Sequence, residues 1–560
     1  MSATILLIMT VVAFILGYIF YGRFISNKLG IDPSRKTPAH TMRDNVDYVP
    51  AKAPVLLGHH FASIAGAAPI IGPITAAVFG WIPVFLWIVF GSIFIGAVHD
   101  FTSLVASVRH QGQSIGKIIE AYIGQRGKQL FLMFSWATLV LIIAAFAILV
   151  ARTFVVTPEV ATSSIFFIIL AILFGLSIYR LNVPLSVATL IGVGVLLICV
   201  WLGVKLPLIF KSLSDNSAQQ VWTWVLLAYI FVASVTPVWI LLQPRDYLNS
   251  FLLYLVLFGA FVGILFTNPM IQLPAITHFV DPKLGAIFPI LFVTVACGAI
   301  SGFHSLVASG TTAKQLDKES DARPIGYGAM LIEGLLAVIA LITVAILLKV
   351  DYSEKLAAVG PIAAFSAGVG GFVEILGIPL NVGITFAALA VSAFALTSLD
   401  TATRLGRFAF QEFFRTENPT SVQRALGNRF VATVFTVVPA GILALSGSYS
   451  AIWPIFGSAN QLLAALALLA GSVWLTKKEQ KNYFLRYPMY FMYAVTLSAL
   501  VLLVYTKIKQ IVNYYSGATM PEAFSLMSTF LLAVIAMILF VVAIILVMEA
   551  YKKLIAKSEQ

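Results

Sequence analysis

Long apolar runs recur along the whole chain and decide its fold class. Hydrophobic residues make up 60% of the 560 residues and charged residues only 10%. Fifteen stretches are close to the roughly 20 apolar residues that an α-helix needs to cross a bilayer. Inside hydrocarbon every peptide group needs a hydrogen-bond partner, so these stretches are expected to be helical. The sequence therefore predicts an all-α polytopic membrane protein with about 15 transmembrane helices.

The distribution of basic residues predicts the orientation of the chain. The net charge is +12, but Lys and Arg lie in short loops between apolar runs, where they act as topology signals rather than as a surface for nucleic acid. Loops on one side of the membrane carry 27 of the 35 basic residues. Because such loops stay in the cytoplasm, we expect an odd number of helices, an external N-terminus and a cytoplasmic C-terminus.

Helix-breaking residues interrupt the second apolar run. Residues 58–73 read GHHFASIAGAAPIIGP. At membrane depth such sequence survives chiefly where protein packing or a wet cavity satisfies the freed peptide groups. The stretch therefore predicts a broken helix beside a transport site. The alternative is a Pro-kinked helix whose small residues serve only packing.

A second interrupted run, residues 297–316, reads CGAISGFHSLVASGTTAKQL. In the predicted topology it runs antiparallel to the first. Two oppositely oriented broken helices are the recurring plan of secondary transporters, in which half-helix N-termini face an anion and loosened carbonyl groups face a cation. The alternative is a pair of packing faces, since Gly298 and Gly302 also form a GxxxG pattern.

The chain divides into four parts. They are an N-terminal transmembrane helix (1–22) without a clear cleavage site, a polar cytoplasmic loop (23–54), a core with inverted repeats (55–475), and a C-terminal pair of helices with a cytoplasmic tail (476–560). Within the core, residues 349–378 mix charge with glycine. We expect an external loop there, with a short re-entrant or interfacial helix.

A cluster of hydroxyl groups and a carboxylate follows in SAFALTSLDTATRLGRFAFQE, residues 392–412. Thr397, Ser398 and Asp400 lie at the predicted cytoplasmic end of an apolar run. Oxygen ligands of this kind suit Na⁺ or H⁺, because hard cations prefer oxygen and a membrane carboxylate is costly without a partner. The alternative for Asp400 is a surface ion pair with Arg404, one helical turn away.

Few other ionisable residues lie inside the apolar runs. Asp100 and Glu333 are the carboxylates, and His59, His60 and His304 are the histidines. These groups are candidates for carrying a coupling proton, because histidine and buried carboxyl groups titrate near neutral pH. A purely structural interhelical hydrogen bond is the alternative for each histidine. A metal site made from His59, His60, His99 and Asp100 is disfavoured, since adjacent residues on a helix diverge by about 100° and cannot chelate one ion together.

Further polar residues are expected to serve packing. Asn460 and Gln461 are amides in an otherwise apolar helix, and Arg245 and Asp246 stand at a predicted helix end, where a structural ion pair or a gate is expected. The two cysteines, in apolar runs, are too few for a disulfide framework or a thiolate metal cluster.

The chain resembles the carbon starvation protein CstA family of bacterial peptide and pyruvate transporters. The matching stretches lie between residues 58 and about 468 and read GHHFASIAGAAPIIGP, GAVHDF, QPRDYL, CGAISGFHSLVASGTTAKQL, SLDTATRLGRF and IWPIFGSANQLLAALAL. The resemblance implies a secondary active transporter of the cell inner membrane, which imports peptides or pyruvate under carbon starvation and is driven by protons. It also implies a leucine-transporter-like core of two inverted five-helix repeats.

Carried over to this sequence, the family pattern makes the break around residues 65–69 one wall of the substrate cavity and residues 298–304 the other. The substrate-binding candidates are His59, His60, Ala65, Gly66, Pro69, Gly298, Ser301, His304 and Ser305. The coupling-ion candidates are Asp100, Glu333, Thr397, Ser398 and Asp400, for H⁺ or Na⁺. The position of Thr397 and Ser398 is the one where related folds bind a cation.

Other classes remain as alternatives. An ion channel would also be polytopic, but it needs a continuous pore and usually a symmetric ring of subunits. A cation-coupled transporter of another small metabolite, such as an amino acid, fits the same features. We expect no enzyme activity, because no catalytic dyad of recognisable spacing is present. We also expect no cofactor and no bound metal. The expected partners are a small-molecule substrate and the lipid bilayer, without nucleic acid.

Overall fold

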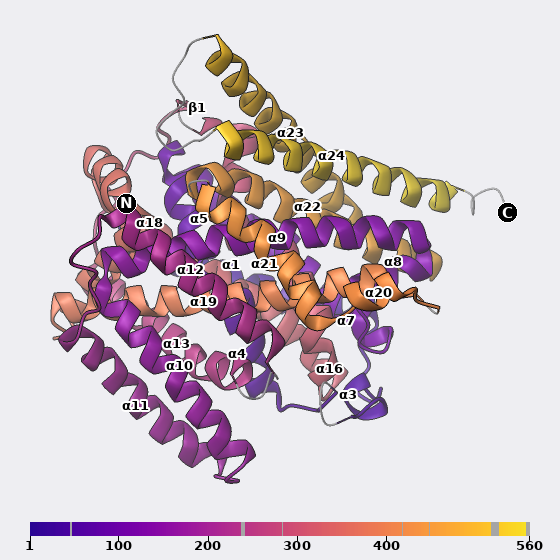
Figure 1. The fold of residues 1–560 in the computed structure, drawn as a ribbon, viewed down its shortest axis with the longest axis horizontal. Helices are drawn as coiled ribbons and strands as arrows, with labels where there is room; N and C mark the ends of the chain where they lie inside the picture. The colour runs from indigo at the N-terminus through magenta and orange to yellow at the C-terminus, as the bar shows by residue number, and fades with distance from the viewer. Residues whose placement is uncertain are drawn as a thin grey trace.

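Helices make up almost all of the computed structural model (Figure 1). It describes residues 1–44, 48–236, 241–282, 284–416, 418–446, 449–516 and 526–555; parts of the predicted 23–54 loop and of the C-terminal tail lie outside these. Within the described residues, 15 helices are long and apolar enough to cross a membrane, and one bent pair, α4 with α5, adds a further candidate span. The predicted all-α polytopic membrane protein is confirmed.

The first of two structural repeats follows the N-terminal helices. Its helices are α4 (Ala53–Ile64) with α5 (Ala68–Ala76), α6 (Trp81–Gly91) with α7 (Ala97–Arg109), α9 (Gln125–Val156), α12 (Asp215–Val235) and α13 (Leu242–Thr267). The short helix α8 (Ile115–Tyr122) precedes α9, and the pair α10 (Pro158–Tyr179) and α11 (Leu185–Lys205) is inserted after it.

The second repeat begins after a small hairpin of β1 (Val280–Asp281) and β2 (Gly285–Ala286). Its helices are α14 (Ile287–Val295) with α15 (Gly302–Val307) and α16 (Ala313–Gln315), α17 (Ala329–Ala345), α19 (Leu380–Phe414), α21 (Arg429–Ser446) and α22 (Tyr449–Lys477). The helix α18 (Lys349–Glu374) precedes α19, and the short helix α20 (Ser421–Leu426) follows it.

The packing of the two repeats is reciprocal. Helix α9 packs against α12, α21 and α22, and its counterpart α19 packs against α21, α12 and α13. Likewise α4 packs against α13 as its counterpart α14 packs against α22. Helices α9 and α19 share the most extensive interface and run through the centre of the molecule (Figure 1). This exchange of equivalent contacts defines the leucine-transporter-like inverted-repeat core.

The two broken helices run in opposite directions. Near the start of the first, His60 Nδ1 lies 2.8 Å from the hydroxyl of Thr312, near the end of the second. Near the end of the first, Gly72 lies against the carbonyl groups of Thr294 and Val295, near the start of the second. A side chain at Gly72 would overlap these carbonyl oxygens, so only glycine allows the two backbones to approach this closely.

Residues 349–374 form the helix α18, which is longer than the short helix expected in an external loop. Its backbone is interrupted at Gly360, where φ is 82° and ψ is 176°. Taken whole, α18 is one of the 15 helices that are long and apolar enough to cross a membrane. Each half on the two sides of Gly360, however, is shorter than the roughly 20 residues that a crossing needs at about 1.5 Å per residue. Helix α18 packs on α17, α13 and α19, as α8 packs on α7, α22 and α9, so it is the crossover helix of the second repeat. It lies at the opposite end of the molecule from α8 and α20 (Figure 1).

Peripheral helices surround the core. They are the continuous helical run α1 (Ala3–Leu16) to α2 (Arg23–Leu29), the short α3 (Pro38–Thr41), α23 (Tyr483–Tyr515) and α24 (Leu526–Ile555). Large apolar side chains on α1, α11 and α24 are exposed, for example Ile15, Leu190 and Phe530. An apolar surface of this extent fits contact with lipid rather than water.

Candidate transport site

Both predicted helix breaks are present. Helix α4 ends at Ile64 and α5 resumes at Ala68, with a bend of 47° between the two parts. In the second repeat, α14 ends at Val295 and α15 starts at Gly302. Between them, Ala296 has a φ of 48°, which is uncommon for a residue with a side chain. The breaks therefore depend on the surrounding packing.

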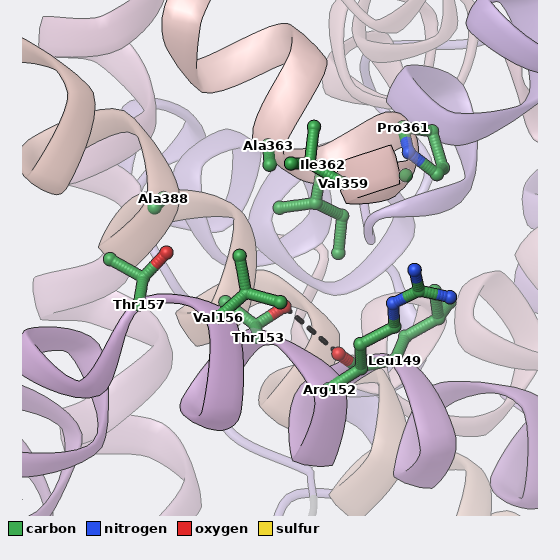
Figure 2. Close-up of a pocket in the computed structure, with 11 residues that line it drawn as sticks. Leu149, Arg152, Thr153, Val156, Thr157, Val359, Pro361, Ile362, Ala363 and Ala388 are labelled. Carbon is green, nitrogen blue, oxygen red and sulfur yellow. Dashed lines mark hydrogen bonds between the residues drawn. The ribbon is translucent and has the colours of Figure 1, made fainter. Parts of the chain in front are cut away.

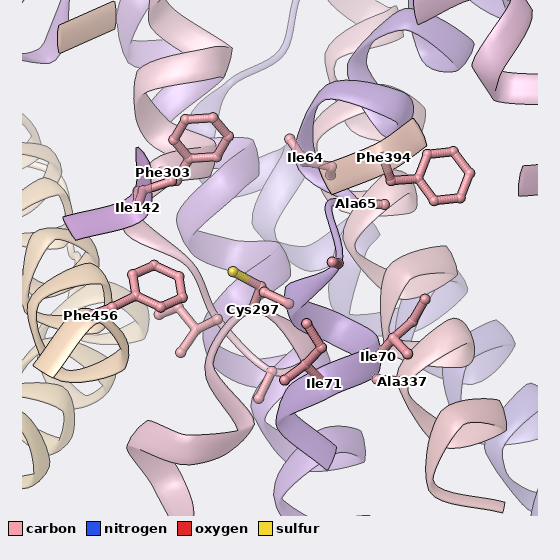
Figure 3. Packing of buried hydrophobic residues seen from close by; sticks show 14 of the residues in the cluster. Ile64, Ala65, Ile70, Ile71, Ile142, Cys297, Phe303, Ala337, Phe394 and Phe456 are labelled. Atoms are coloured by element: carbon pink, nitrogen blue, oxygen red, sulfur yellow. The ribbon is translucent and has the colours of Figure 1, made fainter. Parts of the chain in front are cut away.

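A small closed cavity lies between the two breaks. Its volume is about 10 Å³, roughly the room that one water molecule needs. Figure 3 shows Cys297 pointing toward this region, between Ile142, Phe303 and Phe456 on one side and Ile64 and Ala65 on the other. The lining residues are Ile64, Gly66, Ala68, Ile142, Phe146, Cys297, Phe303, Ser398, Phe456 and Asn460. The walls thus come from both breaks and from α9, α19 and α22.

Asn460 of α22 caps the second half-helix. Its Oδ1 accepts a hydrogen bond of 2.9 Å from the backbone N–H of Phe303, in the first turn of α15. Its Nδ2 donates to the hydroxyl of Ser301 at 3.0 Å, and Cys297 Sγ also donates to that hydroxyl. The side chain satisfies a peptide group that the break sets free, and it lines the cavity. Gln461, by contrast, donates to the carbonyl of Phe292 and joins α22 to α14.

Ser398 of α19 faces Gly66 across the cavity. A Cβ atom at position 66 would overlap the hydroxyl of Ser398, and this buried hydroxyl has no hydrogen-bond partner in the described part of the chain. The Ser398 hydroxyl at the first break is therefore able to form a hydrogen bond with a bound molecule.

We expect Gly66→Ala to lower the stability of the protein, because overpacking a closed interior costs about 1–3 kcal/mol. Adding Ser398→Ala removes the overlapping oxygen and should recover most of this loss, while Ser398→Ala alone should be nearly neutral. Thermal unfolding of the purified protein in detergent measures all three variants. Additive effects would show that the two residues do not touch.

Four buried ionisable side chains form a cluster next to the cavity. Asp100 of α7 lies at its centre: Oδ2 is 2.8 Å from His304 Nδ1 and Oδ1 is 2.7 Å from His99 Nδ1. Glu333 Oε2 of α17 lies 3.4 Å from His304 Nε2. None of the four side chains is exposed to solvent. Because α7 and α17 are counterparts in the two repeats, the cluster bridges the repeats.

Cys297 connects this cluster to the cavity. Its sulfur, a ring nitrogen of His304 and a carboxylate oxygen of Glu333 lie within 4.8 Å of one another, and Cys297 also lines the cavity. His304 already uses Nδ1 for Asp100, and the Glu333 oxygens have no hydrogen-bond partner among the described residues. The simplest cation that this arrangement can share is a proton.

Asp400 lies in the interior of α19 and pairs with Arg245 of α13. The helix continues past the apolar run to Phe414, and Arg404, one turn after Asp400, donates to the backbone carbonyls of Ala233 and Thr236. Arg245 Nη1 donates to Asp400 Oδ2, and the hydroxyl of Tyr229 donates to the same oxygen at 2.9 Å. Both ion-pair partners are 1% exposed. The pair is therefore buried and not a headgroup contact.

Two neighbours complete this second polar cluster. Asp246 Oδ1 lies 3.4 Å from Arg245 Nη2, in keeping with the expected structural ion pair. Asn249 Nδ2 donates to the hydroxyl of Thr397 at 2.7 Å, and that hydroxyl donates to the carbonyl of Ala393. The Thr397 hydroxyl is thus engaged in hydrogen bonds within the protein.

Of the nine substrate-binding candidates, Gly66 alone lines the cavity itself. Ser301 contacts the lining residue Asn460, and His304 lies next to the lining residue Cys297. The others are placed as follows: Ala65 and Pro69 are buried beside the first break, Gly298 packs on Pro73 and Ala337, Ser305 donates to the carbonyl of Gly302, His60 bonds Thr312, and His59 is partly exposed. The histidines of α4 thus lie away from the cavity.

Several lining residues carried no signal in the sequence. Ile142, Phe146 and Phe456 are ordinary apolar residues of uninterrupted helices. Only the positions of α9 and α22 between the two breaks give them a place in the site. Asn460 did carry a signal, as a lone amide in an apolar run.

A vestibule of about 1480 Å³ opens at the end of the molecule that holds α8 and α20. Its lining includes five basic and two acidic residues, namely Lys117, Lys128, Lys314, Arg415, Arg424, Glu120 and Glu412. Its lining also includes Leu139 and Leu306, which stand about one helical turn from Ile142 and Phe303 of the cavity. The barrier between vestibule and cavity is therefore about one turn, roughly 5 Å, thick along each helix.

Ion pairs bind the helices at the vestibule wall. Lys128 Nζ lies 3.0 Å from Glu120 and 3.8 Å from Glu412, so it joins α9 to α8 and α19. Lys117 donates to Glu120 at 2.8 Å, and this hydrogen bond raises the pKa of the Lys117 ammonium. The mouth of the vestibule therefore keeps its positive charge at neutral pH.

The opposite side of the cavity is closed. Gly72 packs on the α14 backbone, the indole N–H of Trp453 donates to the Thr294 carbonyl at 3.3 Å, and the hydroxyl of Tyr352 donates to the Ile74 carbonyl at 2.8 Å. Helix α18 thereby ties down α5. The vestibule thus approaches the cavity to within about one helical turn, whereas these contacts seal the other side.

These features define a multi-pass membrane protein with the architecture of a transporter. A model of the family "Carbon starvation protein CstA" matches residues 2–359 and 350–499. The chain belongs to the carbon starvation protein CstA family.

Relatives in this family are transporters. The chain is 36% identical to the peptide transporter CstA of Helicobacter pylori, over 82% of this chain and 76% of that protein. It is 33% identical to the pyruvate/proton symporter BtsT of Escherichia coli (86% and 78%) and 31% identical to the peptide transporter CstA of Bacillus subtilis (99% and 97%). Among solved structures, it is similar to the manganese transporter of Eremococcus coleocola, with 12% identity and a TM-score of 0.48 over 91% of this chain and 99% of that one.

Proposed function

We propose that the protein is a proton-coupled importer of a small carboxylate, either pyruvate or a short peptide, that works by alternating access when richer carbon sources are scarce. The observation that carries this proposal is the juxtaposition of the cavity between the two breaks with the buried His304–Asp100–Glu333 cluster. Two relatives whose names state peptide transport and one whose name states pyruvate/proton symport support the choice of substrate.

The charge around the pathway favours an anion. Five basic and two acidic residues line the vestibule, and the starts of α5 and α15 both border the cavity. The N-terminal end of a helix carries a partial positive charge. Pyruvate and peptides share a terminal carboxylate, and the Ser398 hydroxyl, which has no hydrogen-bond partner among the described residues, is available to donate to it.

The polar clusters favour H⁺ over Na⁺. A sodium ion at the predicted position would need the oxygen atoms of Thr397, Ser398 and Asp400. Arg245 already supplies a fixed positive charge to Asp400, and the Thr397 hydroxyl is engaged by Asn249. The Asp100 cluster, by contrast, holds two carboxylates and two imidazoles in direct contact, which suits the uptake and release of a proton.

The basic loops support an orientation for this cycle. With these loops in the cytoplasm, the N-terminus is external, the C-terminus is cytoplasmic, and the vestibule opens inward. The present conformation then corresponds to a carrier that has closed toward the outside.

Uptake by proteoliposomes tests the proposal. The purified protein is reconstituted, a proton or a sodium gradient is imposed, and labelled pyruvate and a panel of labelled dipeptides are offered. We expect saturable uptake of one of these substrates with the proton gradient and none with sodium alone. Uptake driven by sodium alone would refute proton coupling, and conductive, non-saturable flux would indicate a channel.

A further inference from the structure

Helix α9 passes three cavities in succession. Leu139 lines the vestibule, Ile142 and Phe146 line the central cavity, and Leu149 and Thr153 line a third cavity near the other end of the helix. The spacing of three and four residues places all five on one face of the helix. Helix α19 repeats the order, with Leu405 at the vestibule, Ser398 at the central cavity and Ala388 at the third. The interface of α9 and α19 therefore marks the transport path.

The third cavity lies where the backbone of α18 turns. Its volume is about 30 Å³, and the positive φ of Gly360 lets α18 turn above it. Figure 2 shows the guanidinium group of Arg152 rising from α9 toward this turn. A Cβ atom on Gly360 would lie 3.9 Å from Cζ of Arg152. The side chain thus stands against the turn, at the sealed end of the path.

Arg152 has no counter-ion among the residues that the structure describes, whereas Lys128, at the vestibule end of the same helix, has two. Along a straight helix the two residues are about 36 Å apart, close to the thickness of a membrane. The other lining residues are mostly aliphatic, with the hydroxyl groups of Thr153 and Thr157 beside them. An arginine fork matches a carboxylate in shape and charge.

We propose that the cavity beside Arg152 is the outer recognition site for the carboxylate of the substrate. The site selects anionic substrates before the transporter opens to the central cavity. Its small size fits a carboxylate group and a short aliphatic stem, with the rest of a larger substrate still outside. This inference rests on the proposed function, and it adds the residue that sets the preference for a negative charge.

Uptake kinetics in right-side-out membrane vesicles test the site. Wild type, Arg152→Gln and Arg152→Lys are compared for labelled pyruvate, or for dialanine if that is the transported substrate. We expect the KM of Arg152→Gln to rise about tenfold, as for a lost charge-assisted hydrogen bond, with Vmax within twofold of wild type. Arg152→Lys should lie between the two. The matched control is Arg126→Gln, an exposed arginine of the same helix, which should leave KM unchanged.

Competition by an uncharged analogue separates recognition from a structural role. Pyruvamide, or dialanine amide, should inhibit wild type less than the acid does, and this difference should shrink in Arg152→Gln. An unchanged KM in that variant, or an undiminished preference for the acid, would overturn the inference while the proposed function stands. If wild type shows no saturable uptake of either substrate, the proposed function fails and the inference falls with it.

Discussion

Glu333→Gln is expected to abolish proton-driven accumulation of substrate while exchange of labelled for unlabelled substrate continues. Glutamine has nearly the same shape as glutamate, and the carboxylate oxygens of Glu333 make no hydrogen bond within the described residues. The substitution therefore removes the exchangeable proton with little change in packing. Accumulation is measured as uptake by proteoliposomes that is driven by an imposed proton gradient. Exchange is measured separately as counterflow without a gradient.

The matched control for this variant is Glu354→Gln, on the exposed surface of α18. It should accumulate substrate as wild type does. Accumulation at the wild-type level by Glu333→Gln would remove this residue from the coupling mechanism. Loss of both accumulation and exchange would assign Glu333 a role in substrate passage instead.

Arg245→Met is expected to lower the free energy of unfolding by about 3–5 kcal/mol, because it leaves a buried carboxylate without its counter-ion. Arg245 and Asp400 are both 1% exposed, and Asp246 depends on the same guanidinium group. The shift of the thermal midpoint in detergent measures the effect.

The double variant Arg245→Met with Asp400→Asn should recover part of this loss, since it removes one of the two carboxylates that lose their counter-ion. Arg126→Met serves as the control, because an exposed ion pair contributes at most about 1 kcal/mol. A midpoint for Arg245→Met close to that of wild type would show that the pair is not buried in the folded protein.

Much of the architecture was predictable from local sequence. The apolar runs gave the helices, since a segment of about 20 apolar residues has few other stable forms in a bilayer. The Gly- and Pro-rich stretches marked both breaks to within a few residues. The helix α18 was underestimated, because charged and glycine residues weakened its hydropathy signal although its faces pack on α17 and α19.

The partners of the polar residues were not predictable in the same way. Asp400 was weighed against Arg404, four residues away, but its partner Arg245 is 155 residues away in the chain. Asp100 and His304 are separated by 204 residues. Local sequence shows that a buried charge needs a counter-ion. It does not show which distant residue supplies that counter-ion.

The sequence by itself determined the class of the protein, its membrane helices and the two points at which helices break, because each of these depends on hydrogen bonding and hydropathy within one segment. Only the tertiary structure decided which groups meet: that Asn460 caps the second break, that Cys297 joins the cavity to the buried acids, and that Arg245 pairs with Asp400. These meetings arise from the packing of two inverted repeats, which brings distant segments into contact.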